Sequence, residues 1–238
     1  MEMIIILKKP IIGIIGRSYN HNGRSVIELN EEYRLAIIKS GGIPLIIVPS
    51  DITDYGNIDF SESVYLSNTD INNLERILSL CDGILMPGGY QWYEFDEYIC
   101  QYALVNDIPI LGICLGMQIL ASIDYFDSAI HDRTVKNDTD INHCQEKQQY
   151  VHKCKVYDGP LKKILNKDLI MVNSRHNYHV TYREYFHVDA YSEDGLIEAI
   201  SIPNHKFAIG VQWHPESMLD YDSDMLKIFN AFITASKK

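Results

Sequence analysis

Short hydrophobic runs alternate with amphipathic stretches along the first half of the chain. The runs are rich in Ile, Leu and Val, are bordered by Gly or Pro as buried strands often are, and cover residues 11–15, 43–48, 83–86 and 109–113. The stretches between them carry apolar residues at helical spacing and cover residues 31–39, 69–80 and 95–105. This alternation predicts a parallel sheet with helices on both faces.

The pattern changes in the second half. Closely spaced apolar segments at residues 150–156, 169–172, 186–191, 196–202 and 207–213 predict strands, and an amphipathic helix at 223–235 closes the chain. Residues 124–149 show little periodicity. We therefore expect an α/β fold with a flavodoxin-like, doubly wound, mostly parallel sheet and an antiparallel β-rich extension, in a single domain over residues 1–238.

Composition narrows the classes of function. The formal net charge is −11 and the sequence holds no basic patch, so a nucleic-acid partner is not expected. Five cysteines without a regular spacing indicate a reduced, cytoplasmic protein. The first ten residues do not form a signal peptide, and no apolar run approaches the roughly 20 residues that span a bilayer.

Cys114 stands at the point where the pattern changes from strand to helix. Gly112 and Gly116 flank it, so little side-chain bulk obstructs a sharp turn there. This is the arrangement of a nucleophile elbow, in which the end of a strand presents a side chain in front of a helix N-terminus. The alternative is a small buried cysteine in the core, and a partner base has to decide between the two.

His214 and Glu216 follow the last predicted strand, with Pro215 between them. A histidine oriented by a carboxylate is the base that a cysteine nucleophile requires. The alternative is that His214 only packs beside Trp213, and the short spacing to Glu216 argues against it.

Four segments together carry a resemblance to a known family. They are Gly112-Ile113-Cys114-Leu115-Gly116-Met117-Gln118, Gly210-Val211-Gln212-Trp213-His214-Pro215-Glu216, Val172-Asn173-Ser174-Arg175-His176 and residues 189–200. The first two resemble the class I glutamine amidotransferase superfamily. The other two resemble the gamma-glutamyl-gamma-aminobutyrate hydrolase family within it. The similarity covers nearly the whole chain.

The resemblance implies a role for each matching residue. Cys114 would be the nucleophile, His214 the general acid and base, and Glu216 the residue that orients His214. Backbone N–H groups of Gly88, Gly89 and Leu115 would form the oxyanion hole. The substrate's amino and carboxylate groups would be held by Gln118, Asn173, Ser174, Arg175 and His176, although His176 could instead belong to a surface loop.

The implied reaction is hydrolysis of a γ-glutamyl amide through a γ-glutamyl thioester on Cys114, without a cofactor. Three departures from the family leave the amine undefined. Leu115 stands where these hydrolases commonly have Arg, residues 125–130 replace a Gly-Gly segment, and Tyr178 replaces a Gln. One alternative is therefore a glutaminase subunit that passes ammonia to a separate synthetase, and another is a catalytically silent binding protein.

Other groups of residues were weighed for chemistry. His143-Cys144 with His152 and Cys154 matches no structural zinc spacing, so no metal is expected. Gly13 to Gly16 is too short for a phosphate loop. Arg17 and Arg133 could bind an anion, but we expect them on the solvated surface. Aromatic residues near the Gly-Gly turn could line a pocket, but their helical spacing favours the core: Trp92, Tyr93, Phe95 and Tyr98.

Overall fold

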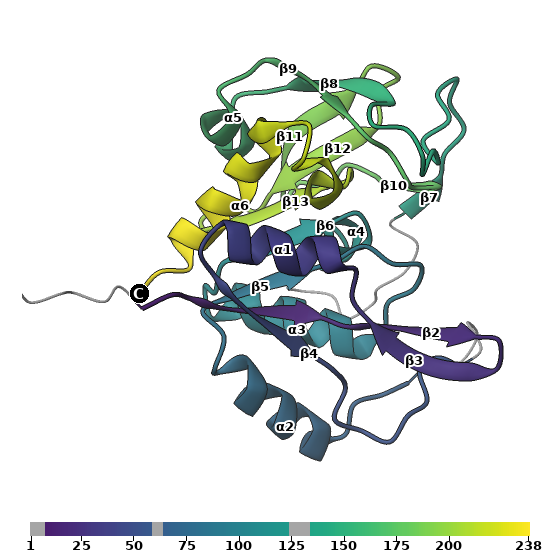
Figure 1. Cartoon of the computed structure of the whole chain (residues 1–238), viewed down its shortest axis with the longest axis vertical. Coiled ribbons are helices and arrows are strands. Elements are labelled where there is room, and N and C mark those ends of the chain that lie inside the picture. The colour runs from purple at the N-terminus through teal and green to yellow at the C-terminus, as the bar shows by residue number, and fades with distance from the viewer. Residues whose placement is uncertain (1–7, 59–63, 124–133) are drawn as a thin grey trace, which may run out of the picture.

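A computed structural model describes residues 8–58, 64–123 and 134–238 (Figure 1). A nine-stranded sheet runs through both halves of the chain in the order β4-β1-β5-β6-β13-β12-β11-β8-β9. Arg133 and residues 125–130 lie outside the described residues. Among the described residues, no helix is long and apolar enough to cross a bilayer.

The sheet changes character at β13. The first five strands are parallel: β4 (Ile43–Ile47), β1 (Ile11–Ile15), β5 (Gly83–Met86), β6 (Ile110–Ile113) and β13 (Ala208–Val211). The last four add in antiparallel fashion: β12 (Ile197–Ser201), β11 (His187–Ser192), β8 (His152–Val156) and β9 (Leu169–Val172). The predicted flavodoxin-like sheet and its antiparallel extension are both confirmed.

Helices cover both faces of the sheet and enclose two hydrophobic cores. One core holds side chains of α1 (Glu31–Lys39), α5 (Pro160–Leu165) and α6 (Ser223–Ala235). The other holds side chains of α2 (Asn68–Leu78), α3 (Glu94–Val105) and α4 (Leu115–Leu120). Successive residues of β1 alternate between the cores, with Ile14 in the first and Ile15 in the second, as the two faces of a strand require.

Two small two-stranded sheets lie outside the large sheet and were not predicted. One consists of β2 (Arg17–His21) and β3 (Arg24–Glu28), and the other of β7 (Thr134–Lys136) and β10 (Tyr178–Val180). Both lie on the same side of the molecule (Figure 1). The first turns at Asn22-Gly23 with φ values of 55° and 84°, a pairing that favours two-residue hairpins. Its strands are polar, so hydrophobic alternation does not mark them.

Candidate active site

Four neighbouring parallel strands end at one edge of the sheet and deliver the candidate residues there. β1 is followed by Arg17, β5 by residues 87–89, β6 by Cys114 and β13 by the segment that carries His214. β6 and β13 are hydrogen-bonded neighbours, with Ile113 opposite Val211. Two segments about a hundred residues apart in sequence therefore reach the same place, as expected for ligand sites of open α/β sheets.

Cys114 forms the sharp turn between β6 and α4. Its backbone has φ 53° and ψ −107°, a strained conformation for a residue other than glycine. The flanking glycines permit the turn, because a Cβ on Gly112 would lie 2.6 Å from the Gly116 carbonyl oxygen and one on Gly116 would lie 2.0 Å from that of Met86. The thiol is only 6% exposed. The position of Cys114 matches a nucleophile elbow. A cysteine that was only packed in the core would not require this strained backbone conformation.

His214 lies between Cys114 and Glu216. Its Nδ1 is 2.7 Å from Glu216 Oε1, and its ring interacts with the charge of the Cys114 sulfur. Burial opposes protonation of the imidazole, but the charges of Glu216 and Cys114 outweigh it and raise the pKa of His214 to about 10.

The same pairing acts on the thiol. Burial raises the pKa of Cys114, yet the charges of His214 and His176 and the N–H of Leu115 lower it below its ordinary value. The pairing therefore favours the thiolate of Cys114 and the imidazolium of His214 relative to the two groups apart.

Two residues hold His214 in place. The side-chain amide of Asn173 forms two hydrogen bonds with the main chain of His214. Its Nδ2 donates to the His214 carbonyl at 2.9 Å, and its Oδ1 accepts from the His214 N–H at 2.8 Å. The Tyr33 hydroxyl lies 3.4 Å from Nδ1 and accepts the Gly88 N–H at 3.0 Å. Both polar ends of the Asn173 side chain are thus engaged by the histidine, which points to a positioning role and not to a contact with substrate.

The Gly88-Gly89 turn approaches the candidate nucleophile closely. A Cβ on Gly88 would lie 2.8 Å from His214 Cε1 and 3.5 Å from Cys114 Cβ, so a larger residue would enter the site. The Gly88 N–H is engaged by Tyr33. The oxyanion donors that the turn and the elbow can supply are then the N–H groups of Gly89 and Leu115.

Arg17 holds the Gly88-Gly89 turn in place through hydrogen bonds to its main chain. It donates to the Pro87 carbonyl at 2.9 Å and to the Gly88 carbonyl at 3.3 Å, and it forms an ion pair with Asp96. Arg17 is 6% and Asp96 1% exposed. The prediction of a solvated Arg17 is therefore wrong. Phe95, by contrast, is buried in the core as expected, whereas Tyr93 lines a cavity described below.

Replacing Arg17 with alanine is expected to lower the free energy of unfolding by about 3–5 kcal/mol, because it leaves Asp96 buried without its partner. Chemical denaturation monitored by circular dichroism measures the effect. Arg34→Ala is the matched control, since it removes an ion pair with Glu31 on the exposed face of α1 and should change stability little. Equal losses in the two variants would contradict the bracing role of Arg17.

The other predicted substrate residues occupy different places. Arg175 lines the cavity at Cys114 and donates to Ser217 Oγ at 3.0 Å. Gln118 is buried behind the elbow and donates to the Tyr178 carbonyl at 3.0 Å. Ser174 and His176 are buried as well, so His176 is not on a surface loop. Of the predicted set, Arg175 is the residue that reaches the cavity.

That cavity has a volume of about 360 Å³ and opens at Cys114 and His214. Its walls include four residues that the sequence analysis did not single out: Tyr19, Tyr33, Tyr90 and Glu146. A second cavity of about 320 Å³ adjoins it, and Tyr19 and Tyr90 line both. Tyr55, Tyr93 and Arg17 also line the second cavity. These side chains come from several separate segments, near residues 17–19, 33, 55, 90–93 and 146, so no local spacing could have grouped them all.

The histidines weighed for zinc also come together, but in a different set. His143 and His152 join His176 and Glu198 in a buried cluster. Cys144 is exposed, and Cys154 Sγ lies 3.6 Å from His152 Nδ1 on the outer side of that ring. Sequence spacing could not indicate this cluster, because its members come from four separate segments.

Comparison with known proteins agrees with the class that the fold and the elbow define, the class I glutamine amidotransferase-like proteins. The glutaminase domain of Trypanosoma brucei CTPS, solved with bound acivicin, superposes with a TM-score of 0.63 at 17% identity over 95% of this chain and 93% of that one. A GMP synthase subunit from Thermoplasma acidophilum superposes with a TM-score of 0.64 at 19% identity over 96% and 94%. These likenesses establish the fold.

Sequence comparison gives the family. The Peptidase C26 family model matches residues 92–216, and the chain belongs to this family of glutamine amidotransferase-like hydrolases. The gamma-glutamyl-gamma-aminobutyrate hydrolase PuuD of Escherichia coli is 30% identical over 97% of this chain and 94% of its own. A glutamine amidotransferase-like protein of Rickettsia prowazekii is 30% identical over 97% and 99%.

Proposed function

We propose that this protein hydrolyses γ-glutamyl amides that carry a substituent on the amide nitrogen, releasing glutamate and an amine. The observation that carries the proposal is the second cavity, which adjoins the one at Cys114 and shares Tyr19 and Tyr90 with it. Free glutamine has no group to place there. The 30% identity to PuuD over nearly both chains supports the same assignment.

The reaction proceeds by nucleophilic catalysis. The Cys114 thiolate attacks the γ-carbonyl carbon, and the resulting oxyanion accepts hydrogen bonds from the Gly89 and Leu115 N–H groups. The His214 imidazolium gives its proton to the departing amine as the C–N bond breaks, which leaves a γ-glutamyl thioester on the sulfur. His214, now neutral, removes a proton from water, which attacks the thioester and returns the thiolate.

Opposite charges in the first cavity suit the glutamyl group. The Arg175 guanidinium can pair with the α-carboxylate, and the Glu146 carboxylate can pair with the α-ammonium. The two charges distinguish a zwitterionic α-amino acid from a simple amide. They orient the glutamyl group of the substrate so that its γ-carbonyl reaches Cys114.

The aromatic second cavity suits the substituent of the amine. Tyr90 is 80% exposed, and its ring packs edge-on against Tyr19 with 6.1 Å between the ring centroids. The ring centroids of Tyr55 and Tyr93, which line the same cavity, lie 4.7 Å apart. Rings of this kind offer contact area to aliphatic and aromatic groups. We assign this cavity to the leaving amine.

Tyr90→Ala is expected to lower kcat/KM for N-substituted γ-glutamyl amides about tenfold and for free glutamine less, because Tyr90 lines both cavities and only a substituted amide also fills the second one. Glutamate release across a panel of such amides measures this. Tyr65→Ala is the matched control, since Tyr65 is also 80% exposed and lines neither cavity. Wild-type turnover of free glutamine that equals or exceeds that of every substituted amide would contradict the proposal.

The second candidate is a glutaminase subunit for a separate synthetase. Leu115 favours it, because amidotransferases have this residue after the nucleophile. A CTP synthase of Lactiplantibacillus plantarum is 30% identical over 78% of this chain and 40% of its own length. Glutamine hydrolysis that rises when an ATP-using partner co-purifies would favour this function over the first.

A further inference from the structure

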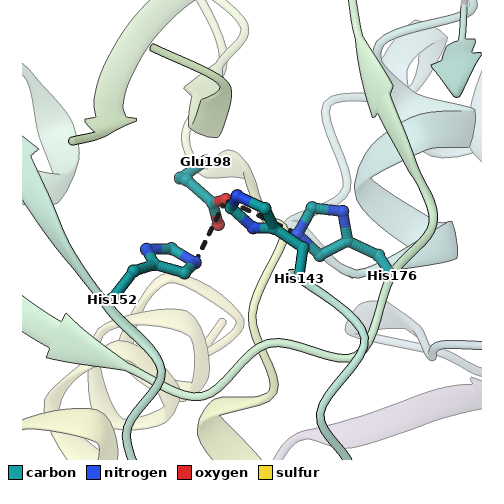
Figure 2. A group of neighbouring side chains, drawn as sticks. All are labelled: His143, His152, His176 and Glu198. Atoms are coloured by element: carbon teal, nitrogen blue, oxygen red, sulfur yellow. Dashed lines mark ion pairs between the residues drawn. The ribbon is translucent and has the colours of Figure 1, made fainter. Parts of the chain in front are cut away.

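Three histidines and one glutamate form a buried group (Figure 2). His152 comes from β8, Glu198 from β12, His143 from the loop before β8, and His176 from the loop between β9 and β10. Each of the four is at most 4% exposed. The side chains converge from different directions on the Glu198 carboxylate (Figure 2).

The outward nitrogens of two rings each face a hydrogen-bond acceptor at short distance. His143 Nε2 lies 2.9 Å from the Asp194 carboxylate, and His176 Nδ1 lies 2.9 Å from the Tyr178 carbonyl. The Asp194 carboxylate places the ring hydrogen of His143 on Nε2. The Asn137 Nδ2 group also lies 3.3 Å from His176 Nδ1, but the shorter contact to the Tyr178 carbonyl favours the ring hydrogen on that nitrogen. In the neutral ring, the lone pair is then on the inward nitrogen, an arrangement typical of histidine metal ligands.

The inward nitrogens face an acceptor as well. His143 Nδ1, His152 Nε2 and His176 Nε2 each lie 3.5 Å from Glu198 Oε1. His152 Nε2, His176 Nε2 and both Glu198 oxygens have no hydrogen-bond partner within the described part of the chain, and His143 Nδ1 has only the Ser174 hydroxyl at 3.1 Å. A buried carboxylate surrounded by lone pairs requires a positive charge between them.

We propose that this group binds one Zn²⁺ ion through His143 Nδ1, His152 Nε2, His176 Nε2 and a Glu198 carboxylate oxygen. Imidazole and carboxylate ligands in a four-coordinate set suit Zn²⁺. Tetrahedral bonds of about 2.0–2.1 Å place the ligand atoms about 3.4 Å apart, close to the 3.5 Å between Glu198 and each ring. The four ligand atoms lie within 4.8 Å of one another, and small ring rotations close the remaining gap.

Four protein ligands leave no open position, so the ion has a structural role. It ties β8 and β12 to the loop that follows β9. The same loop carries Asn173, which holds the His214 main chain, and Arg175, which lines the cavity. The ion therefore fixes the segment that positions the candidate base. The proposal stands independently of the substrate, because metal binding is measured without turnover.

Metal analysis of the purified chain tests the site directly. We expect one zinc per chain after exhaustive dialysis, and after removal by a chelator one Co²⁺ that shows the intense visible bands of tetrahedral coordination. Glu198→Gln and His152→Gln should each lose the ion and those bands. His21→Gln is the matched control, because His21 is an exposed histidine on the β2–β3 hairpin and should retain both.

Thermal unfolding of the wild-type chain gives a second measurement, which does not depend on whether the variants fold. Zn²⁺ at about 100 times its Kd should raise the Tm of the chelator-treated wild-type chain by about 5–10 °C. An absence of bound metal and of a Tm shift would overturn the proposal and leave protons as the charge inside the group. Zinc that persists in Glu198→Gln but disappears in Cys114→Ser would overturn it too, because the ion would then sit on the thiolate.

Discussion

Replacing Cys114 with alanine is expected to lower kcat for γ-glutamyl amides by about 10⁴-fold or more, because the variant has no atom that can form the thioester. The fold should remain, since alanine fits where the buried thiol packs and leaves the other contacts of the site in place. Glutamate release measured against the wild-type chain gives the ratio. Residual activity within tenfold of wild type would exclude covalent catalysis at this residue.

The matched control is Cys144→Ala, which removes an exposed thiol that is not part of the elbow. A glutamine-mimicking electrophile extends the test, because it should label Cys114 and leave Cys144 unmodified. Mass spectrometry of peptides locates the adduct. If exposure governed reactivity, Cys144 would be labelled first, so the labelling order separates an activated thiolate from an accessible thiol.

Glu216→Gln is expected to lower kcat by about 10²–10⁴-fold and to narrow the pH range of activity. In the wild-type chain the pKa of Cys114 lies below the ordinary 9.0 and that of His214 is about 10, so kcat/KM rises on the acid side of 9.0 and falls as the pH passes about 10. The amide has no charge to hold the imidazolium. The alkaline limb should therefore move to lower pH and the acid limb to higher pH.

Rates of Cys114 alkylation and of turnover, each measured against pH, check this expectation. Tyr33 from α1 and His176 from the loop after β9 also face the pair, but burial raises the pKa of Tyr33 well above its ordinary value, so Tyr33 stays neutral over this range. Glu32→Gln is the matched control, since Glu32 is an exposed carboxylate that accepts a hydrogen bond from Ser217 Oγ. Unchanged limbs in Glu216→Gln would contradict the role of its charge.

The sequence was sufficient for features that depend on neighbouring residues. Ile110–Ile113 is apolar and Gly112 and Gly116 flank Cys114, so the strand, the elbow and the helix follow from one short segment. Pro215 similarly holds Glu216 close to His214. Parallel strands then bring the ends of β6 and β13 together by topology.

Features that depend on contacts between distant segments were not predictable. Arg17 and Asp96 are 79 residues apart, and nothing near Arg17 signals a buried carboxylate. Asn173 lies in a segment typical of the family, but its use in holding His214 follows from a contact over 41 residues. The histidines converge because β8 and β12 both flank β11, an order that hydrophobic periodicity does not reveal.

The β2–β3 hairpin contributes Tyr19 to the cavity wall but belongs to a sheet separate from the one that carries the reacting groups. Apart from Arg17, which holds the glycine turn, its side chains and its length can therefore vary without moving the sulfur, the imidazole or that turn. Related chains that share the same chemistry could differ in which amine they release simply by exchanging this appendage. Grafting residues 18–28 between them is a direct route to altered selectivity.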